Sequence, residues 1–134
     1  MTYVVAYIGT AIVFFALDYI WLSRVAFGFY RSQIGHVLLD QPNFLAAGVF
    51  YLFYVGGIVY FAVAPAIASD NWTQALIAGA ILGLVAYGTY DMTNLATVKD
   101  WSVAVTIVDM VWGATLTALS ATAGFYAVRL FSGS

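Results

Sequence analysis

The sequence contains no cysteine, and only 7% of its 134 residues are charged. Without cysteine, disulfides, thiolate metal sites, iron–sulfur clusters and cysteine nucleophiles are all excluded. A soluble domain carries about 25% charged residues, so this chain cannot cover a surface that faces water. The total of four Lys and Arg residues is too small for a nucleic-acid-binding surface, and we expect no nucleic-acid partner.

Several cofactor classes also lack a signature in this chain. No P-loop or dinucleotide fingerprint is present, so no nucleotide cofactor is expected. A haem needs axial ligands, and the single histidine, His36, lies outside the apolar stretches. No spacing of acidic residues is specific to a metal ion, and we expect no metal. The identity of any other cofactor stays open.

Long apolar stretches dominate what is present. A helix needs about 20 mostly apolar residues to cross a bilayer, and four stretches meet this length: residues 3–23, 44–64, 75–95 and 102–127. Pro65 is expected to end the second of them. We therefore predict an all-α integral membrane protein, a four-transmembrane-helix bundle that forms a single membrane domain over residues 1–134 and lies in the lipid bilayer.

The link at residues 24–43 mixes apolar residues with Arg24, Arg31, His36 and Asp40. This mixture predicts an interfacial segment between helices 1 and 2, part of it helical. The link and the turn at residues 96–101 lie on one side of the membrane and carry three basic residues, against one on the other side. Because basic loops stay in the cytoplasm, we expect this side to be cytoplasmic and both termini to lie outside.

Three acids fall inside the expected spans: Asp18, Asp91 and Asp109. A carboxylate near the bilayer centre costs at least ~2.5 kcal/mol, so such residues face the interior of a bundle and have a partner. At 1.5 Å per residue, each lies ~7–9 Å from the midpoint of its expected helix. Because helix direction alternates, all three are displaced toward the same side, and we expect them to form one layer.

Helical spacing brings further polar and aromatic residues to this layer. Trp21 shares a face with Asp18, and Trp112 shares one with Asp109. The second helix enters from the same side, which places Tyr51 at a comparable depth. The expected ligand-binding residues are Asp18, Trp21, Tyr51, Tyr87, Asp91, Asn94, Asp109 and Trp112, with Arg31, His36 and Lys99 at the rim.

Simpler interpretations of the same residues stay open. Asp91 and Asp109 could be hydrogen-bonded across helices for packing alone. Asp18 could reach headgroup water or pair with Arg24. Trp101 is typical of an aromatic anchor at the membrane interface. Gly79 and Gly83 form a GxxxG pattern that permits close helix contact, and we expect a homo-oligomer, most simply a homodimer, although tight packing within one chain is the alternative.

Three motifs resemble the DUF2177 family of bacterial membrane proteins: Leu17-Asp-Tyr-Ile-Trp-Leu22, Tyr87-Gly-Thr-Tyr-Asp-Met-Thr-Asn-Leu-Ala-Thr97 and Asp109-Met-Val-Trp-Gly113. The resemblance covers nearly the whole chain and implies a four-helix fold in a bacterial cytoplasmic membrane. The family's function is undefined, so the resemblance implies no activity. Its motif acids would be Asp18, Asp91 and Asp109, the same three that depth identifies.

These observations favour a one-sided acidic and aromatic pocket within the membrane. Such a pocket would bind a small polar, cationic or amphipathic ligand, with proton-coupled transport as one use. An accessory or structural subunit, whose polar residues only join helices, is the alternative from a different class. A membrane enzyme that acts on a lipid or isoprenoid, with an aspartate as acid or base, is a third.

Overall fold

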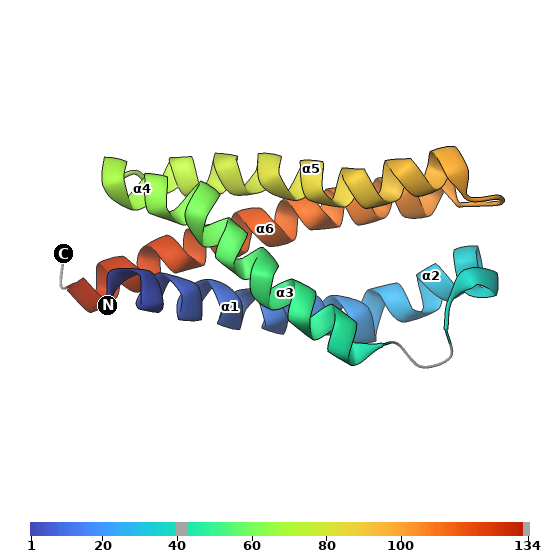
Figure 1. The fold of residues 1–134 in the computed structure, drawn as a ribbon, viewed down its shortest axis with the longest axis horizontal. Coiled ribbons are helices and arrows are strands. Elements are labelled where there is room, and N and C mark those ends of the chain that lie inside the picture. The colour runs from blue at the N-terminus through green and yellow to red at the C-terminus, as the bar shows by residue number, and fades with distance from the viewer. Residues whose placement is uncertain (40–42, 133–134) are drawn as a thin grey trace.

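The fold consists of four helical stretches, of which the second, with α3, crosses the long axis obliquely while the others follow it (Figure 1). A computed structural model describes residues 1–39 and 43–132 of the chain. The stretches span Thr2–Val37, Phe44–Ser69, Trp72–Thr97 and Val103–Ser132, and each is long and apolar enough to cross a membrane. No strand occurs among the described residues. The all-α fold with four candidate spans is therefore confirmed.

The first stretch is longer than the sequence indicated. Helix α1 (Thr2–Trp21) continues through a π-helical turn η1 (Leu22–Ala26) into α2 (Phe27–Ile34) and a short 3-10 turn η2 (Gly35–Val37). We expected the helix to end near Ser23, directly before the first basic residue, Arg24, but no residue there breaks a helix. Arg24 is exposed, so its charge need not enter the bundle. Residues 40–42 of the expected interfacial link lie outside the described residues, and its interfacial position stays a prediction.

The second stretch also passes its expected end at Pro65. It consists of α3 (Phe44–Ile58), a π-helical turn η3 (Val59–Val63) and α4 (Ala64–Ser69). Proline lacks an N–H and its ring clashes with the carbonyl four residues earlier in an α-helix. The π-helical turn directly before α4 is wider than an α-helical turn. It leaves room for the proline ring and tolerates the absent N–H, so the helix continues. It ends at Asp70, whose φ of 50° is left-handed.

The third and fourth stretches, α5 (Trp72–Thr97) and α6 (Val103–Ser132), form an antiparallel pair. Glycines allow their backbones to touch. A Cβ at Gly79 would lie 2.9 Å from the Cα of Ala118, and one at Gly83 would collide with the backbone of Gly113. The GxxxG pattern therefore packs within one chain, between α5 and α6. The expected homodimer stays a prediction, but this pair of glycines is not free to form its seam.

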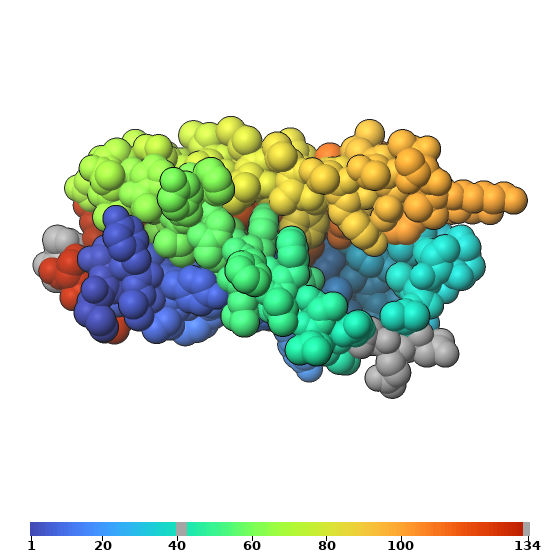
Figure 2. All heavy atoms as spheres, in the orientation of Figure 1, coloured from blue at the N-terminus to red at the C-terminus, as the bar shows by residue number. Residues whose placement is uncertain are grey.

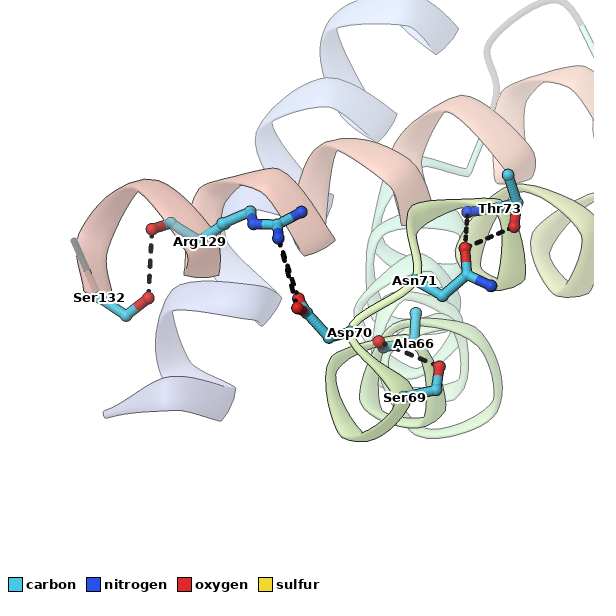
Figure 3. Close-up of polar contacts among 7 residues, drawn as sticks. All are labelled: Ala66, Ser69, Asp70, Asn71, Thr73, Arg129 and Ser132. Atoms are coloured by element: carbon cyan, nitrogen blue, oxygen red, sulfur yellow. Dashed lines mark hydrogen bonds and ion pairs between the residues drawn. The ribbon is translucent and has the colours of Figure 1, made fainter. Parts of the chain in front are cut away.

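The end of the bundle that holds both termini is closed by tight packing. Fully buried Phe14, Ile58 and Leu116 belong to a core that α1, α3 and α6 share. On the surface of this end, Arg129 of α6 reaches the turn between α4 and α5 and pairs with Asp70 at 3.2 Å (Figure 3). Toward the opposite end α3 diverges from α5 (Figure 1), and the packing opens.

Candidate functional site

A cavity of about 460 Å³ lies where α3 diverges from the bundle. Figure 2 shows this face hollowed between α5 on one side and α2 and α3 on the other. All four helical stretches contribute to its wall. The lining residues are Asp18, Trp21, Leu22, Tyr30, Ile34, Leu38, Ala47, Phe50, Tyr51, Tyr54, Ala86, Tyr87, Tyr90, Asp91, Trp101, Val105, Asp109 and Trp112.

Asp91 is the most unusual of these residues. Its side chain is 0% exposed, and neither carboxyl oxygen accepts a hydrogen bond from any described residue. The carboxyl of Asp109 and the hydroxyls of Tyr30 and Tyr90 are close enough to interact with it electrostatically. Two ionised carboxylates accept but do not donate, so they form a hydrogen bond only when one of them carries a proton.

Asp109 is half-buried and has a clear donor. The Tyr30 hydroxyl donates to Asp109 Oδ1 at 2.7 Å, which joins α2 to α6 across the cavity wall. Counted from the observed helix bounds, Asp91 lies ~10 Å and Asp109 ~13 Å from the midpoint of its helix. Both are displaced toward the α5–α6 turn. The two carboxyls are therefore placed at nearly one level by two antiparallel helices.

Asp18 lies on the wall formed by α1. The Trp112 indole N–H donates to Asp18 Oδ1 at 3.4 Å, and the Tyr51 hydroxyl also interacts with this carboxyl. The rings of Trp21 and Trp112 stack at 4.4 Å with planes 6° apart. The stacked rings form a flat aromatic surface next to the Asp18 carboxylate, to which Trp112 donates.

Two more polar groups of the wall lack partners. The indole N–H groups of Trp21 and Trp101 are buried and donate to no described residue. The lining residues that the structure describes include no Lys, Arg or His. Buried polar groups in native proteins are nearly all paired. The Asp91 carboxyl and the indoles of Trp21 and Trp101 are therefore three exceptions to this rule around one cavity.

Most of the residues that the sequence indicated lie around this cavity. Its wall contains Asp18, Trp21, Tyr51, Tyr87, Asp91, Asp109 and Trp112. Asn94 is half-buried one turn beyond Tyr90 and does not line it. The three expected rim residues, Arg31, His36 and Lys99, are also outside the wall. The Arg31 guanidinium instead lies 5.0 Å from the centre of the Phe27 ring.

The sequence analysis missed Tyr30, Tyr90 and Trp101. Tyr30 belongs to the stretch that we assigned to the interface, and Trp101 was expected to be an aromatic anchor. A signal for Tyr30 exists in hindsight: Leu22, Ala26, Tyr30, Ile34 and Leu38 recur at every fourth residue, which is the spacing of one helix face. Four of these five line the cavity, and Ala26 is buried beside them.

Comparison with known proteins identifies the family. The profile of the family described as "Predicted membrane protein (DUF2177)" matches residues 3–126. No curated protein and no solved structure matches the chain. The match covers all four helical stretches and the three acids of the cavity wall. The chain therefore belongs to the DUF2177 family of predicted membrane proteins.

Proposed function

We propose that this protein binds an organic cation within its transmembrane bundle, between Asp91 and Asp109, and exchanges it for a proton. The observation that carries the proposal is the Asp91 carboxyl, which is fully buried, unpaired and part of the cavity wall. An isolated buried charge is strongly unfavourable and is normally neutralised or paired. A proton or a bound cation is the simplest means of neutralising it.

The charge around the cavity supports a cationic ligand. Three carboxyls line it, and none of its described lining residues is basic. Like charges in a low-dielectric interior repel, so Asp91 and Asp109 are stable together when they share one proton. A cation that enters between them would displace this proton to water. The site would then hold one positive charge beside two carboxylates.

The aromatic wall supports an organic cation. Ammonium groups are attracted to the faces of Trp and Tyr rings at distances up to about 6 Å, and more strongly when water is excluded. The wall presents the stacked Trp21 and Trp112 together with Tyr87 and Tyr90. Among the described residues, no three acidic or imidazole groups stand close enough to hold a metal ion. A volume of about 460 Å³ is within the range for small organic ligands.

The test is binding of tetramethylammonium by the purified protein in lipid nanodiscs, measured by calorimetry in two buffers of different ionisation enthalpy. We expect saturable binding with close to one proton released per cation. The matched control is Asp70→Asn, which changes an exposed aspartate at the opposite end of the bundle and should bind normally. If wild type shows no saturable binding of tetramethylammonium or tetraethylammonium, the proposal is wrong.

One set of contacts favours a second function, that of an accessory subunit. The Tyr54 hydroxyl and Thr117 Oγ1 are 2.8 Å apart, and Trp112 bonds Asp18, so part of the polar layer does join helices. In this alternative Asp91→Asn would change thermal stability and no ligand would bind. Binding data on the same variant therefore distinguish the two functions.

We also propose that the protein lies in a bacterial cytoplasmic membrane with both termini outside. The support is the excess of Arg24, Arg31 and Lys99 in the half of the bundle that holds the α5–α6 turn over Arg129 in the other half. A homodimer remains part of the proposal. Its support is the small size of the bundle, which leaves large side chains such as Phe53 and Phe61 78% and 61% exposed. A second copy or lipid would cover this surface.

A further inference from the structure

We infer that the cation is amphipathic: its charged head lies at Asp91 and Asp109, and its apolar chain leaves the cavity sideways, between α3 and α5, into the bilayer. This inference rests on the proposed function, because it names the ligand class of the same site. Its evidence is the position of the cavity mouth, which is independent of the acids themselves.

Residues that line the cavity and are also exposed on the outer surface mark its mouth. Three large ones do both: Leu22 is 48% exposed, Phe50 61% and Tyr90 56%. They belong to η1, α3 and α5. Figure 2 shows a hollow on the long side of the molecule at this place, between α5 and the pair α2 and α3. The mouth therefore opens through the side of the bundle.

The depth of the mouth places it in hydrocarbon. Tyr90 is ~8 Å along the helix from the midpoint of α5, and Phe50 is at most ~10 Å from the midpoint of its stretch. The hydrocarbon core extends ~15 Å on each side of the bilayer centre. With the spans centred in the membrane, the mouth faces acyl chains, while Asp91 lies at about the level of the mouth and Asp109 lies ~3 Å farther toward the α5–α6 turn.

The end of the cavity nearer that turn is closed. Ser102 Oγ donates to Gln33 Oε1 at 2.9 Å, and the Tyr30 hydroxyl donates to Asp109, so two bonds hold α2 against α6. Trp101, at the turn itself, contributes its ring to the wall. Access from water would require these contacts to separate. Access from the side separates no hydrogen bond that joins α3 to α5 among the described residues.

The chemistry of the wall changes along the same direction. The carboxyls of Asp91 and Asp109 and the hydroxyl of Tyr30 form one end of the wall, whereas Leu22, Ala47, Phe50 and the ring of Tyr90 form the mouth, with Asp18 one helical turn before Leu22. Gly48, on the same part of α3, has no atom within 4 Å of the position where a Cβ would lie, so this side of α3 faces open space. A charged head followed by an alkyl chain matches this order of polar and apolar wall.

The first test uses alkyltrimethylammonium ions with chains from butyl to dodecyl, bound to the protein in nanodiscs. If the chain lies in lipid, affinity referred to the aqueous concentration should rise about fourfold per methylene with no cut-off, because each CH₂ leaves water. Asp91→Asn in the same nanodiscs measures non-specific partitioning, which is subtracted. A plateau or decline once the chain fills the cavity would show an enclosed ligand and overturn the inference.

If the proposed function is wrong and the site binds no cation, the same experiment gives a different result from a plateau in the chain-length series. In that case no member of the series, including tetramethylammonium, would bind wild type better than Asp91→Asn. An aminolipid and a free amine with an alkyl chain both offer an ammonium head and an apolar chain. To distinguish these two sources, binding is measured in nanodiscs of phosphatidylethanolamine and in nanodiscs of phosphatidylglycerol. Competition by phosphatidylethanolamine alone would identify a lipid headgroup as the source, and no competition would identify a free amphiphile. Both results support an amphipathic cation.

The second test locates the mouth without any ligand. Because the native chain has no cysteine, Phe50→Cys can be labelled uniquely. We expect a membrane-soluble maleimide to react at least tenfold faster than a charged, water-soluble one, with Lys99→Cys, exposed at the turn, showing the reverse order. Dodecyltrimethylammonium, but not tetramethylammonium, should protect the site. Equal reaction of Phe50→Cys and Lys99→Cys with the charged reagent would overturn the inference; Tyr90→Cys repeats the test if Phe50→Cys does not fold.

Discussion

Replacing Asp91 by asparagine is the sharpest change that the structure offers. Asn has nearly the shape of Asp, and its amide N–H is a hydrogen-bond donor, as the O–H of a protonated Asp91 is. The wild-type carboxyl accepts no hydrogen bond from the described residues, so the substitution removes no accepted bond. We therefore expect Asp91→Asn to fold and to change the free energy of unfolding by less than ~1 kcal/mol.

Binding should respond much more strongly. Removing one partner of a buried, desolvated charge pair costs about 2–5 kcal/mol. At 1.4 kcal/mol per factor of ten, the lower end of that range is roughly a 30-fold loss of affinity for tetramethylammonium. The proton released on binding should fall toward zero, because Asn holds no exchangeable acid proton at this position. Calorimetry in two buffers measures both quantities on one sample.

Two outcomes would refute this reasoning. If the affinity of Asp91→Asn for tetramethylammonium is within threefold of the wild-type affinity, with the same proton release, the buried carboxyl is not the cation's partner. If it lowers thermal stability and no ligand binds even to wild type, the accessory-subunit alternative is correct. Asp91→Leu, which leaves Asp109 without its neighbour, should cost ~1–3 kcal/mol of stability and shows what a purely structural loss looks like.

Four other predictions follow from the helix contacts and the sequence. Gly83→Ala should destabilise the protein by about 1–3 kcal/mol through collision with α6, whereas Gly56→Ala, which meets nothing within 4 Å, should be neutral or stabilising in the same thermal unfolding assay. Tyr30→Phe should cost roughly 1.5–3 kcal/mol, because it removes the donor to Asp109; an unchanged melting temperature would contradict this. Cross-linking in native membranes should trap a dimer, and a monomer at every protein-to-lipid ratio would exclude it. Gln33→Cys should be labelled only from the cytoplasmic side; labelling from outside intact cells would reverse the orientation.

The layer of acids was accessible to sequence reasoning because it depends on few physical quantities. Apolar stretches locate the spans, and a constant rise per residue gives the depth of each acid within its span. Alternating direction then determines whether the depths agree. The observed bounds move the midpoint of α5 by less than one residue and that of α6 by three. Asp91 and Asp109 still lie on the same side of their helix midpoints, at ~10 and ~13 Å, although α5 and α6 are both longer than expected.

The shape of the cavity was less accessible because it depends on where the helices deviate from ideal geometry. Hydropathy treated Arg24 as the end of a helix and Pro65 as the end of another, yet a π-helical turn lies at or just before each position. Each such turn adds a residue and rotates the faces that follow it. An ideal register of 3.6 residues per turn therefore misplaces Tyr30 and Ile34, whereas the four-residue spacing from Leu22 to Leu38 follows the wider turn. The divergence of α3, which creates the mouth, leaves no sequence signal that we can identify.

The distribution of small and large residues explains why the bundle is open at one end, and it bears on function. Gly79, Gly83 and Gly113 let α5 and α6 touch along the closed part. Directly beyond this seam the ring of Tyr87 packs on Gly113, and large aromatic rings replace glycines along the wall of the cavity. If Asp91 and Asp109 served only to join helices, the expected place for them would be the seam, where short side chains can reach across a close contact. They lie instead beside the space that the aromatic rings hold open, with the Asp91 oxygens unpaired among the described residues. This arrangement favours a bound ligand over helix packing as the reason for these acids, since packing alone would gain stability from replacing them with apolar residues.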